Sequence, residues 1–339
     1  MSRRMLTVVA AGLLAMALGV IGATLPVPFV ALGPGPTHDT LGLYEGTEIV
    51  SVEGLPEYPT SGHLNMTTVS VTDGLSLFTS LYFWAAGDRQ VIPREAVFPS
   101  DRTDEQIQEA NAAQFASSEA DAEAAAVREL GIPAQVVVGG VVPGSPAAGL
   151  LEPGDAIVAV AGQPVDSAAE VSELVATARP GETVTITFRR DGVEQQAEVV
   201  LAARPDRPQG FLGITPTVEA REGSIDISLD GIGGPSAGLM FALAVVDRLT
   251  PGELTGGRFI AGTGTIDPTG AVGAIDGIPF KMAKASAVGA EVFLVPAANC
   301  AEAAATAPDG LALVRVTTLD DALAELDALR EGRPVTSCA

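Results

Sequence analysis

One uninterrupted apolar segment near the N-terminus constrains this chain more strongly than any other feature of its sequence. Residues 5–25 carry no charged side chain, and they directly follow Arg3 and Arg4. About twenty apolar residues suffice for a helix to cross a bilayer, because a helix satisfies its own backbone polar groups. Arginines at the start predict that this end stays inside the cell. The sequence therefore predicts a transmembrane helix in a single-pass cell-membrane protein whose remaining domains are extracytoplasmic.

A cleavable signal peptide is the competing interpretation of the same segment. Residues 21–23, Ile-Gly-Ala, would serve as its cleavage site. The apolar core of a signal peptide is usually shorter than this segment, which favours an uncleaved anchor. Both interpretations export the rest of the chain.

Length, charge and cysteine content limit what the exported part can be. The 339 residues suffice for two or three domains, and the net charge of −23 opposes non-specific binding to nucleic acid. Cys300 and Cys338 allow at most one disulfide, and we expect the stretch around Cys338 to lack fixed structure. The sequence contains neither metal-ligand spacing nor a phosphate-binding loop, so we expect no metal and no cofactor.

A candidate nucleophile lies in the motif GPSAG at residues 234–238, where a glycine-rich turn leads into an apolar stretch. Backbone N–H groups at a helix start are unpaired, and the helix dipole favours negative charge there. Ser236 could therefore attack a carbonyl group with oxyanion donors, among them the backbone N–H of Ala237, already in place. A serine after Gly-Pro is also a common helix cap, so the motif alone supports either role.

A serine nucleophile needs a base, and the lysines of the chain supply a candidate. Only Lys281 and Lys284 are lysines among the 19 basic residues. Arginine cannot be deprotonated in a protein, whereas a desolvated lysine can. A helix start and apolar neighbours around Lys281 would both lower its pKa. Asp267 and Asp276 would oppose that shift, so we expect both to lie away from the amine.

Further motifs extend this pattern over the last third of the chain: GTGTI at 262–266, Gly270, Gly277 and VFLVP at 292–296. Together with GPSAG and Lys281 they resemble the proteolytic domain of the Lon family. The resemblance implies that Ser236 is the nucleophile, that Lys281 rather than Lys284 is its base, and that Thr263 orients the lysine. Many Lon proteases have an acidic residue where this chain has Gly233, so the electrostatics of the site differ. Lon-type domains commonly form rings, which implies a homo-oligomer.

The region before residue 130 carries fewer signals. An apolar helix is predicted over residues 75–84, and we expect Trp84 to be a core residue rather than a membrane-proximal aromatic. A helix rich in alanine and glutamate is predicted over residues 104–130, as a bridge between domains.

A second pattern begins with a predicted strand at residues 136–142. GSPAAGL at 144–150 and GDAIVAVAG at 154–162 follow, then a helix over 167–178 and two strands joined by Asp191-Gly192. This order resembles a bacterial PDZ domain, a fold that binds an extended peptide as an added strand. The resemblance implies a groove between residues 131–138 and the helix, although no clear carboxylate-binding motif precedes that strand. A purely structural role for the domain stays open.

Together these patterns predict an α+β multidomain protein. Its expected parts are a cytoplasmic stub and anchor over 1–25, an extracytoplasmic region over 26–130, a PDZ-like domain over 131–203 and a Lon-like α+β domain over 204–339. The predicted function is an ATP-independent, membrane-anchored serine endopeptidase that recruits peptides or unfolded proteins through its PDZ groove. The alternative is a non-catalytic, membrane-tethered scaffold with an inactive Lon-like domain. A protein that cleaves only its own chain is a third interpretation.

Overall fold

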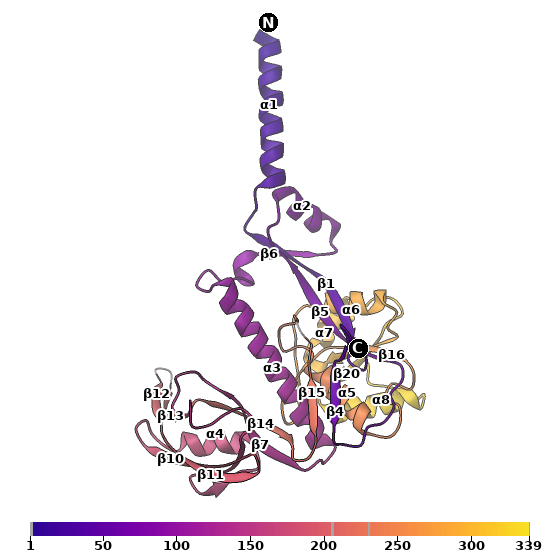
Figure 1. Ribbon diagram of the computed structural model, residues 1–339. Coiled ribbons are helices and arrows are strands. Elements are labelled where there is room, and N and C mark those ends of the chain that lie inside the picture. The colour runs from indigo at the N-terminus through magenta and orange to yellow at the C-terminus, as the bar shows by residue number, and fades with distance from the viewer. Residues whose placement is uncertain (1–2, 205–206, 230, 339) are drawn as a thin grey trace.

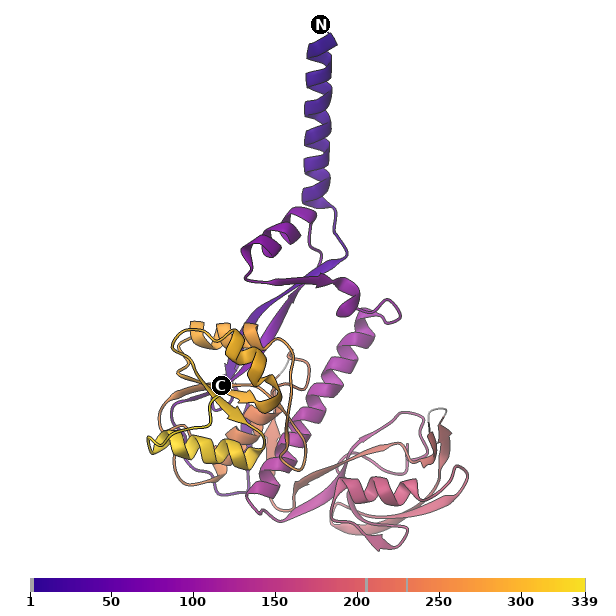
Figure 2. The same ribbon diagram turned by 180° about the vertical axis from the view of Figure 1, so that it is seen from behind.

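An N-terminal helix stands apart from the folded domains. The computed structural model describes residues 3–204, 207–229 and 231–338, and helix α1 (Arg3–Thr24) projects from one end of it (Figure 1). The side chains of α1 are exposed almost throughout, and the helix is long and apolar enough to cross a membrane. The prediction of an N-terminal apolar helix is confirmed. A second, shorter helix, α2 (Leu77–Ala86), lies at the base of α1 in both views (Figures 1 and 2).

A mixed six-stranded sheet organises the part of the chain that contains the predicted dyad. Its strand order is β20-β19-β16-β5-β1-β6, with β5, β16, β19 and β20 parallel and β1 antiparallel to both its neighbours. The bounds are β1 (Phe29–Asp39), β5 (His63–Thr72), β6 (Gln90–Pro93), β16 (Phe259–Gly262), β19 (Val292–Pro296) and β20 (Ala312–Val316). Strand β19 lies in the core, since all its residues are buried and it is parallel to both its neighbours. Strands from the expected N-terminal region thus share one sheet with strands from the expected C-terminal domain.

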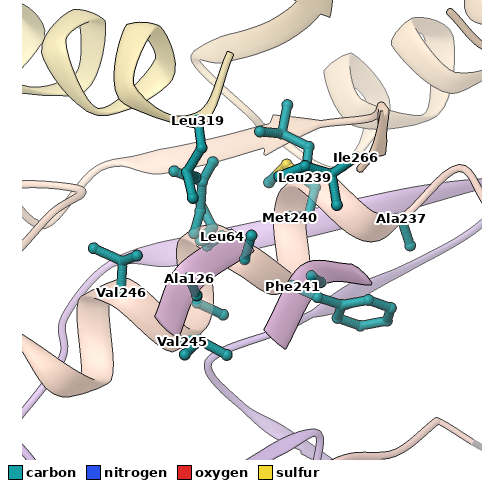
Figure 3. Packing of buried hydrophobic residues seen from close by; sticks show 14 of the residues in the cluster. Leu64, Ala126, Ala237, Leu239, Met240, Phe241, Val245, Val246, Ile266 and Leu319 are labelled. Carbon is teal, nitrogen blue, oxygen red and sulfur yellow. The ribbon is translucent and has the colours of Figure 1, made fainter. Parts of the chain in front are cut away.

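Helices cover both faces of this sheet, because successive residues of a strand point to opposite sides. One face, with Leu64 and Leu294, packs on α3, α5 and α8. Figure 3 shows part of this core, with Leu64 of β5, Val245 of α5 and Leu319 of α8 among the labelled side chains. The other face, with Phe293 and Val295, packs on α6 and α7. The helix bounds are α3 (Asp104–Glu129), α5 (Gly238–Leu249), α6 (Ile278–Ala287), α7 (Cys300–Ala305) and α8 (Leu319–Arg330). The apolar sequence of α5 is explained by this position, since it is buried from Gly238 to Arg248.

A second, antiparallel sheet forms a separate body beyond the end of α3 (Figure 1). Its order is β11-β10-β8-β7-β14, with β9 beside β8, and helix α4 (Ala168–Ala176) packs on it. The bounds are β7 (Ala134–Val141), β8 (Ala156–Val160), β9 (Gln163–Pro164), β10 (Thr183–Arg190), β11 (Val193–Val200) and β14 (Ile214–Ala220). Strand β14 lies beyond residue 203, where we expected this domain to end, so the sheet extends across that boundary.

Short elements complete the two bodies and their connections. They are β2 (Leu43–Tyr44), β3 (Thr47–Glu48), β4 (Val50–Glu53), β12 (Ala202–Arg204), β13 (Arg207–Phe211), β15 (Ser224–Ile227), β17 (Thr265–Ile266), β18 (Val272–Gly273) and the 3-10 turns Arg94–Ala96 and Ala297–Asn299. Strands β4 and β15 pair with each other, as do β12 and β13.

The C-terminal stretch is held against the first sheet. Cys300 and Cys338 form a disulfide. The backbone N–H of Arg315 in β20 donates to the carbonyl of Thr336 at 2.9 Å. The expectation that residues near Cys338 lack fixed structure is therefore wrong, because a covalent link and a strand contact fix them beside β20.

Candidate active site

Ser236 lies in the turn that leads into α5, two residues before the helix begins. Two hydrogen bonds join helix α3 to this turn. The hydroxyl of Ser118 donates to the carbonyl of Pro235 at 3.1 Å, and the backbone N–H of Gly234 donates to the carbonyl of Asn111 at 3.2 Å. Helix α3, expected only as a bridge between domains, therefore also positions the candidate nucleophile.

Lys281 reaches Ser236 from the first turn of α6. The turn before this helix needs Gly277, whose φ is 74°, and a proline occupies a favourable place in the first helical turn. Only 2% of Lys281 is exposed, and its Nζ lies 2.8 Å from the Oγ of Ser236. The structure thus brings the two predicted residues together from elements 45 residues apart in the sequence.

The other partners of Lys281 determine which way a neutral amine would point. Its Nζ lies 2.9 Å from the carbonyl oxygen of Thr67 and 3.0 Å from the Oγ1 of Thr263. A carbonyl only accepts, and the Thr263 hydroxyl already donates its hydrogen to the carbonyl of Ser236 at 3.0 Å, so both must accept from the lysine. A neutral amine has two N–H donors and one lone pair. With both donors engaged, the lone pair is left for the hydroxyl hydrogen of Ser236.

Burial favours that neutral form. It lowers the pKa of Lys281 from 10.5 to about 8, while the negative charge of Asp276 acts in the opposite direction. Asp276 lines the same cavity as the lysine, so the expectation that it lies away from the amine is wrong. Asp267 instead accepts hydrogen bonds within its own turn, from the backbone N–H groups of Thr269 and Ala271.

Three further residues contact Ser236 or Lys281 or lie next to them. Thr263 and Ala237 were predicted from the sequence, and Thr67 was not. Thr263 is fully buried and bonds both Lys281 and the carbonyl of Ser236, while Ala237 immediately precedes α5. The backbone N–H of Ala237 has no hydrogen-bond partner among the described residues, which leaves it available to a ligand. Thr67 was missed, because no sequence signal placed β5 beside the C-terminal motifs.

A cavity of about 510 Å³ opens beside the two side chains. Ser236, Ala237 and Lys281 all line it. Much of the remaining wall is apolar: Leu32, Met66, Val69, Phe115, Ile232 and Ile275. The cavity therefore presents a largely apolar surface beside Ser236. Among the described residues there is no group of three or more His, Cys, Asp or Glu side chains that could hold a metal ion.

A second cavity, of about 330 Å³, lies in the other body, between α4 and the chain that enters β14. Val171, Val175 and Ala176 line it from the helix, and residues 209–214 line it from the other side. Strand β7 is flanked by β8 and β14, so β14 is the edge strand of this sheet next to α4. An edge strand has unpaired backbone groups that can bind an added strand.

Comparisons with known proteins identify this second body. A family model described as PDZ domain matches residues 107–201. The chain contains a PDZ domain. Among solved structures, the chain is similar to the PDZ domains of SdrC-like proteins from Listeria monocytogenes and Listeria innocua. Both are 30% identical, each match covers 24% of this chain and 86% or 90% of the other, and the TM-scores are 0.23 and 0.22. A Geobacillus thermodenitrificans structure is 40% identical over 22% of this chain and 85% of its own, with a TM-score of 0.20.

The structure does not form a groove at the place that the sequence predicts. We expected it between residues 131–138 and the helix, but β7 is paired on both edges and the cavity lies beside β14. The sequence before β14 is GFLG at residues 210–213, a glycine–hydrophobic motif of the kind that was not found before β7. Because the matched residues end at 201, the family match says nothing about Ser236 and Lys281.

Proposed function

We propose that this protein is a membrane-anchored serine endopeptidase that works without ATP through a Ser236–Lys281 dyad. The contact of 2.8 Å between the Nζ of a buried lysine and the Oγ of a serine carries the proposal. A lysine buried in a protein is costly unless it is paired or neutral, and functional sites commonly shift pKa values in this way. The resemblance of the surrounding motifs to Lon proteolytic domains supports the same role.

In the proposed reaction, the lone pair of Lys281 takes the hydroxyl proton of Ser236 as its Oγ attacks a peptide carbonyl. The oxyanion that forms accepts a hydrogen bond from the backbone N–H of Ala237. Lys281 then gives its proton to the departing amine, which leaves an acyl group on Ser236. Lys281 then takes a proton from a water molecule as its oxygen attacks the acyl carbonyl, and returns that proton to the Oγ of Ser236 as the acid product leaves. Thr67 and Thr263 hold the amine in place throughout.

The PDZ domain supplies the proposed recruitment of substrate. PDZ domains bind peptides, and here the groove beside β14 offers an edge strand and an apolar wall. We propose that unfolded or locally disordered chains bind there before they reach Ser236. The apolar helix α1 supports anchorage in a membrane, and the Cys300–Cys338 disulfide supports an oxidising, extracytoplasmic location.

The test compares variants of the full chain in detergent micelles on an unstructured protein substrate. Arginine at position 281 keeps the charge but cannot release its proton, so Lys281→Arg should lose at least about 100-fold in rate, as should Ser236→Ala. Lys284→Arg is the matched control, since Lys284 lies one turn further along α6 and has no described bond to Ser236. Equal rates for Lys281→Arg and the unmodified chain would overturn the dyad.

A peptide-binding scaffold is the second candidate function, and the PDZ domain itself favours it. In that case the groove beside β14 would hold partners at the membrane and Ser236 would be a structural turn residue. A Ser236→Ala chain that keeps the full cellular function of the protein would support the scaffold. Loss of that function with normal folding would support the peptidase.

A further inference from the structure

Helix α2 exposes an apolar surface that nothing in the described chain covers. Residues 74–87 contain no charged side chain. The large apolar side chains exposed on α2 are Leu77, Phe78, Leu81, Tyr82 and Trp84. Trp84 is 75% exposed, so the expectation that it is a core residue is wrong. Soluble surfaces rarely concentrate so many large apolar side chains on one short helix, and such patches mark interaction sites.

The position of α2 relative to α1 indicates what covers this surface. The ring of Phe78 packs directly on Gly22, in the last part of α1, where an added Cβ would lie only 2.9 Å from it. The backbone N–H of Val27 donates to the carbonyl of Leu75 at 2.8 Å, just before α2 begins. These contacts fix α2 at the end of α1 that faces the folded domains (Figures 1 and 2).

The length of α1 sets the depth at which α2 lies. A helix of 22 residues is about 33 Å long, close to the roughly 30 Å thickness of the hydrocarbon core of a bilayer. If α1 crosses the membrane, as proposed above, its contact with Phe78 therefore falls at the boundary between hydrocarbon and headgroups. Tyrosine and tryptophan are enriched at that boundary, because each combines an apolar ring with a polar group.

We propose that α2 is a second membrane contact, lying in the lipid–water interface on the side of the folded domains. Its exposed aromatic and aliphatic side chains enter the region between headgroups and acyl chains, as in amphipathic helices that bind bilayer surfaces. Arg89 follows the helix, and its guanidinium lies 5.0 Å from the ring of Phe83 and donates to the Oγ1 of Thr72 at 3.0 Å. With two contacts instead of one, the folded domains keep a fixed orientation to the bilayer rather than rotating about a single helix.

The chain provides its own probe for this proposal, because Trp84 is its only tryptophan. The full chain is reconstituted into phosphatidylcholine vesicles that carry bromine atoms at different positions along the acyl chains. We expect bromines close to the headgroups to quench Trp84 fluorescence most strongly, with progressively weaker quenching by deeper ones. Flotation of the vesicles in a density gradient reports anchorage by α1 in the same samples.

Flotation tests the membrane contact of α1, and quenching of Trp84 tests that of α2. Chain that floats but shows no quenching by bromolipids, with Trp84 accessible to iodide, would overturn the placement of α2 and leave α1 as an anchor. Shielding from iodide without bromolipid quenching would show that a second copy covers α2, which also overturns the proposal. Chain that fails to float would overturn both contacts, while leaving the dyad untouched.

A charged substitution provides the matched comparison. Leu81→Asp should abolish most of the bromolipid quenching of Trp84, whereas Val193→Asp, at an exposed apolar residue of the PDZ domain, should change nothing. Both variants should float and should keep the cleavage rate on a detergent-solubilised substrate. Unchanged quenching in Leu81→Asp would contradict the proposed lipid contact.

Discussion

The pH dependence of cleavage provides a quantitative test of the dyad. In the proposed mechanism only the neutral form of Lys281 accepts the serine proton, and its pKa is about 8. About a tenth of the protein would then have a neutral lysine at pH 7, and about nine tenths at pH 9. We therefore expect kcat/KM to rise about tenfold between these pH values, with a slope of one below pH 8 and a plateau above.

Asp276 makes this prediction specific to the site. Its carboxylate raises the pKa of Lys281, so Asp276→Asn should lower that pKa and shift the rising limb of the profile to lower pH. The variant should therefore cleave faster than the unmodified chain at pH 7 and equally fast at pH 9. Asp267→Asn is the control, because Asp267 bonds within its own turn, and it should leave the midpoint where it is.

The assay is cleavage of a fluorogenic peptide by the full chain in micelles at constant ionic strength, with kcat/KM measured from pH 6 to pH 10. Circular dichroism at each pH excludes unfolding as the source of any change. A flat profile, or a midpoint that does not move in Asp276→Asn, would refute the account of Lys281 as the base.

Substitutions at Thr263, Lys281 and Ala176 test the contacts of the lysine, its burial and the groove beside β14. Thr263→Val removes an acceptor of Lys281 and should reduce kcat about tenfold or more with little change in KM, whereas Thr263→Ser should retain most activity. Lys281→Met should abolish cleavage, yet at pH 7 it should raise the free energy of unfolding in urea by up to about 3 kcal/mol. Burial of the charged lysine destabilises the fold. This cost grows as the pH falls from 10.5 to about 8 and stays constant at lower pH. Stability of the unmodified chain that stays level across that window would contradict the burial argument. Ala176→Glu, in the wall of the PDZ groove, should weaken peptide binding measured by calorimetry without slowing cleavage of a short peptide, while Glu173→Gln on the same helix should do neither.

Elements whose signal lies in one continuous stretch of sequence could be predicted. The uncharged segment 5–25 predicted α1, because the apolar stretch is continuous in sequence. The order of strands and turns over residues 136–201 predicted the PDZ domain for the same reason. Because 45 residues separate Ser236 and Lys281, no local pattern shows that they meet. Their contact was predicted from the resemblance of the surrounding motifs to the Lon family.

Features that depend on long-range pairing were not predictable in this way. Thr67 approaches Lys281 because β5 pairs with β16, whose residues lie almost 200 positions further along the chain. The proposed groove was predicted beside the wrong strand because β14, beyond the expected domain end, pairs with β7 and takes the edge of the sheet. Trp84 was expected in the core because an apolar helix has the same sequence pattern whether protein or lipid covers it.

The proposed mechanism requires that a peptide substrate acylate Ser236. The most direct measurement is intact-protein mass spectrometry after rapid acid quenching of the full chain with an excess of a peptide ester at pH 8. We expect a mass increase equal to the acyl group, located on Ser236 by fragmentation. It should be absent in Ser236→Ala and should appear much more slowly in Lys281→Arg. An acyl group on another residue, or equal acylation in Ser236→Ala, would contradict the proposed mechanism.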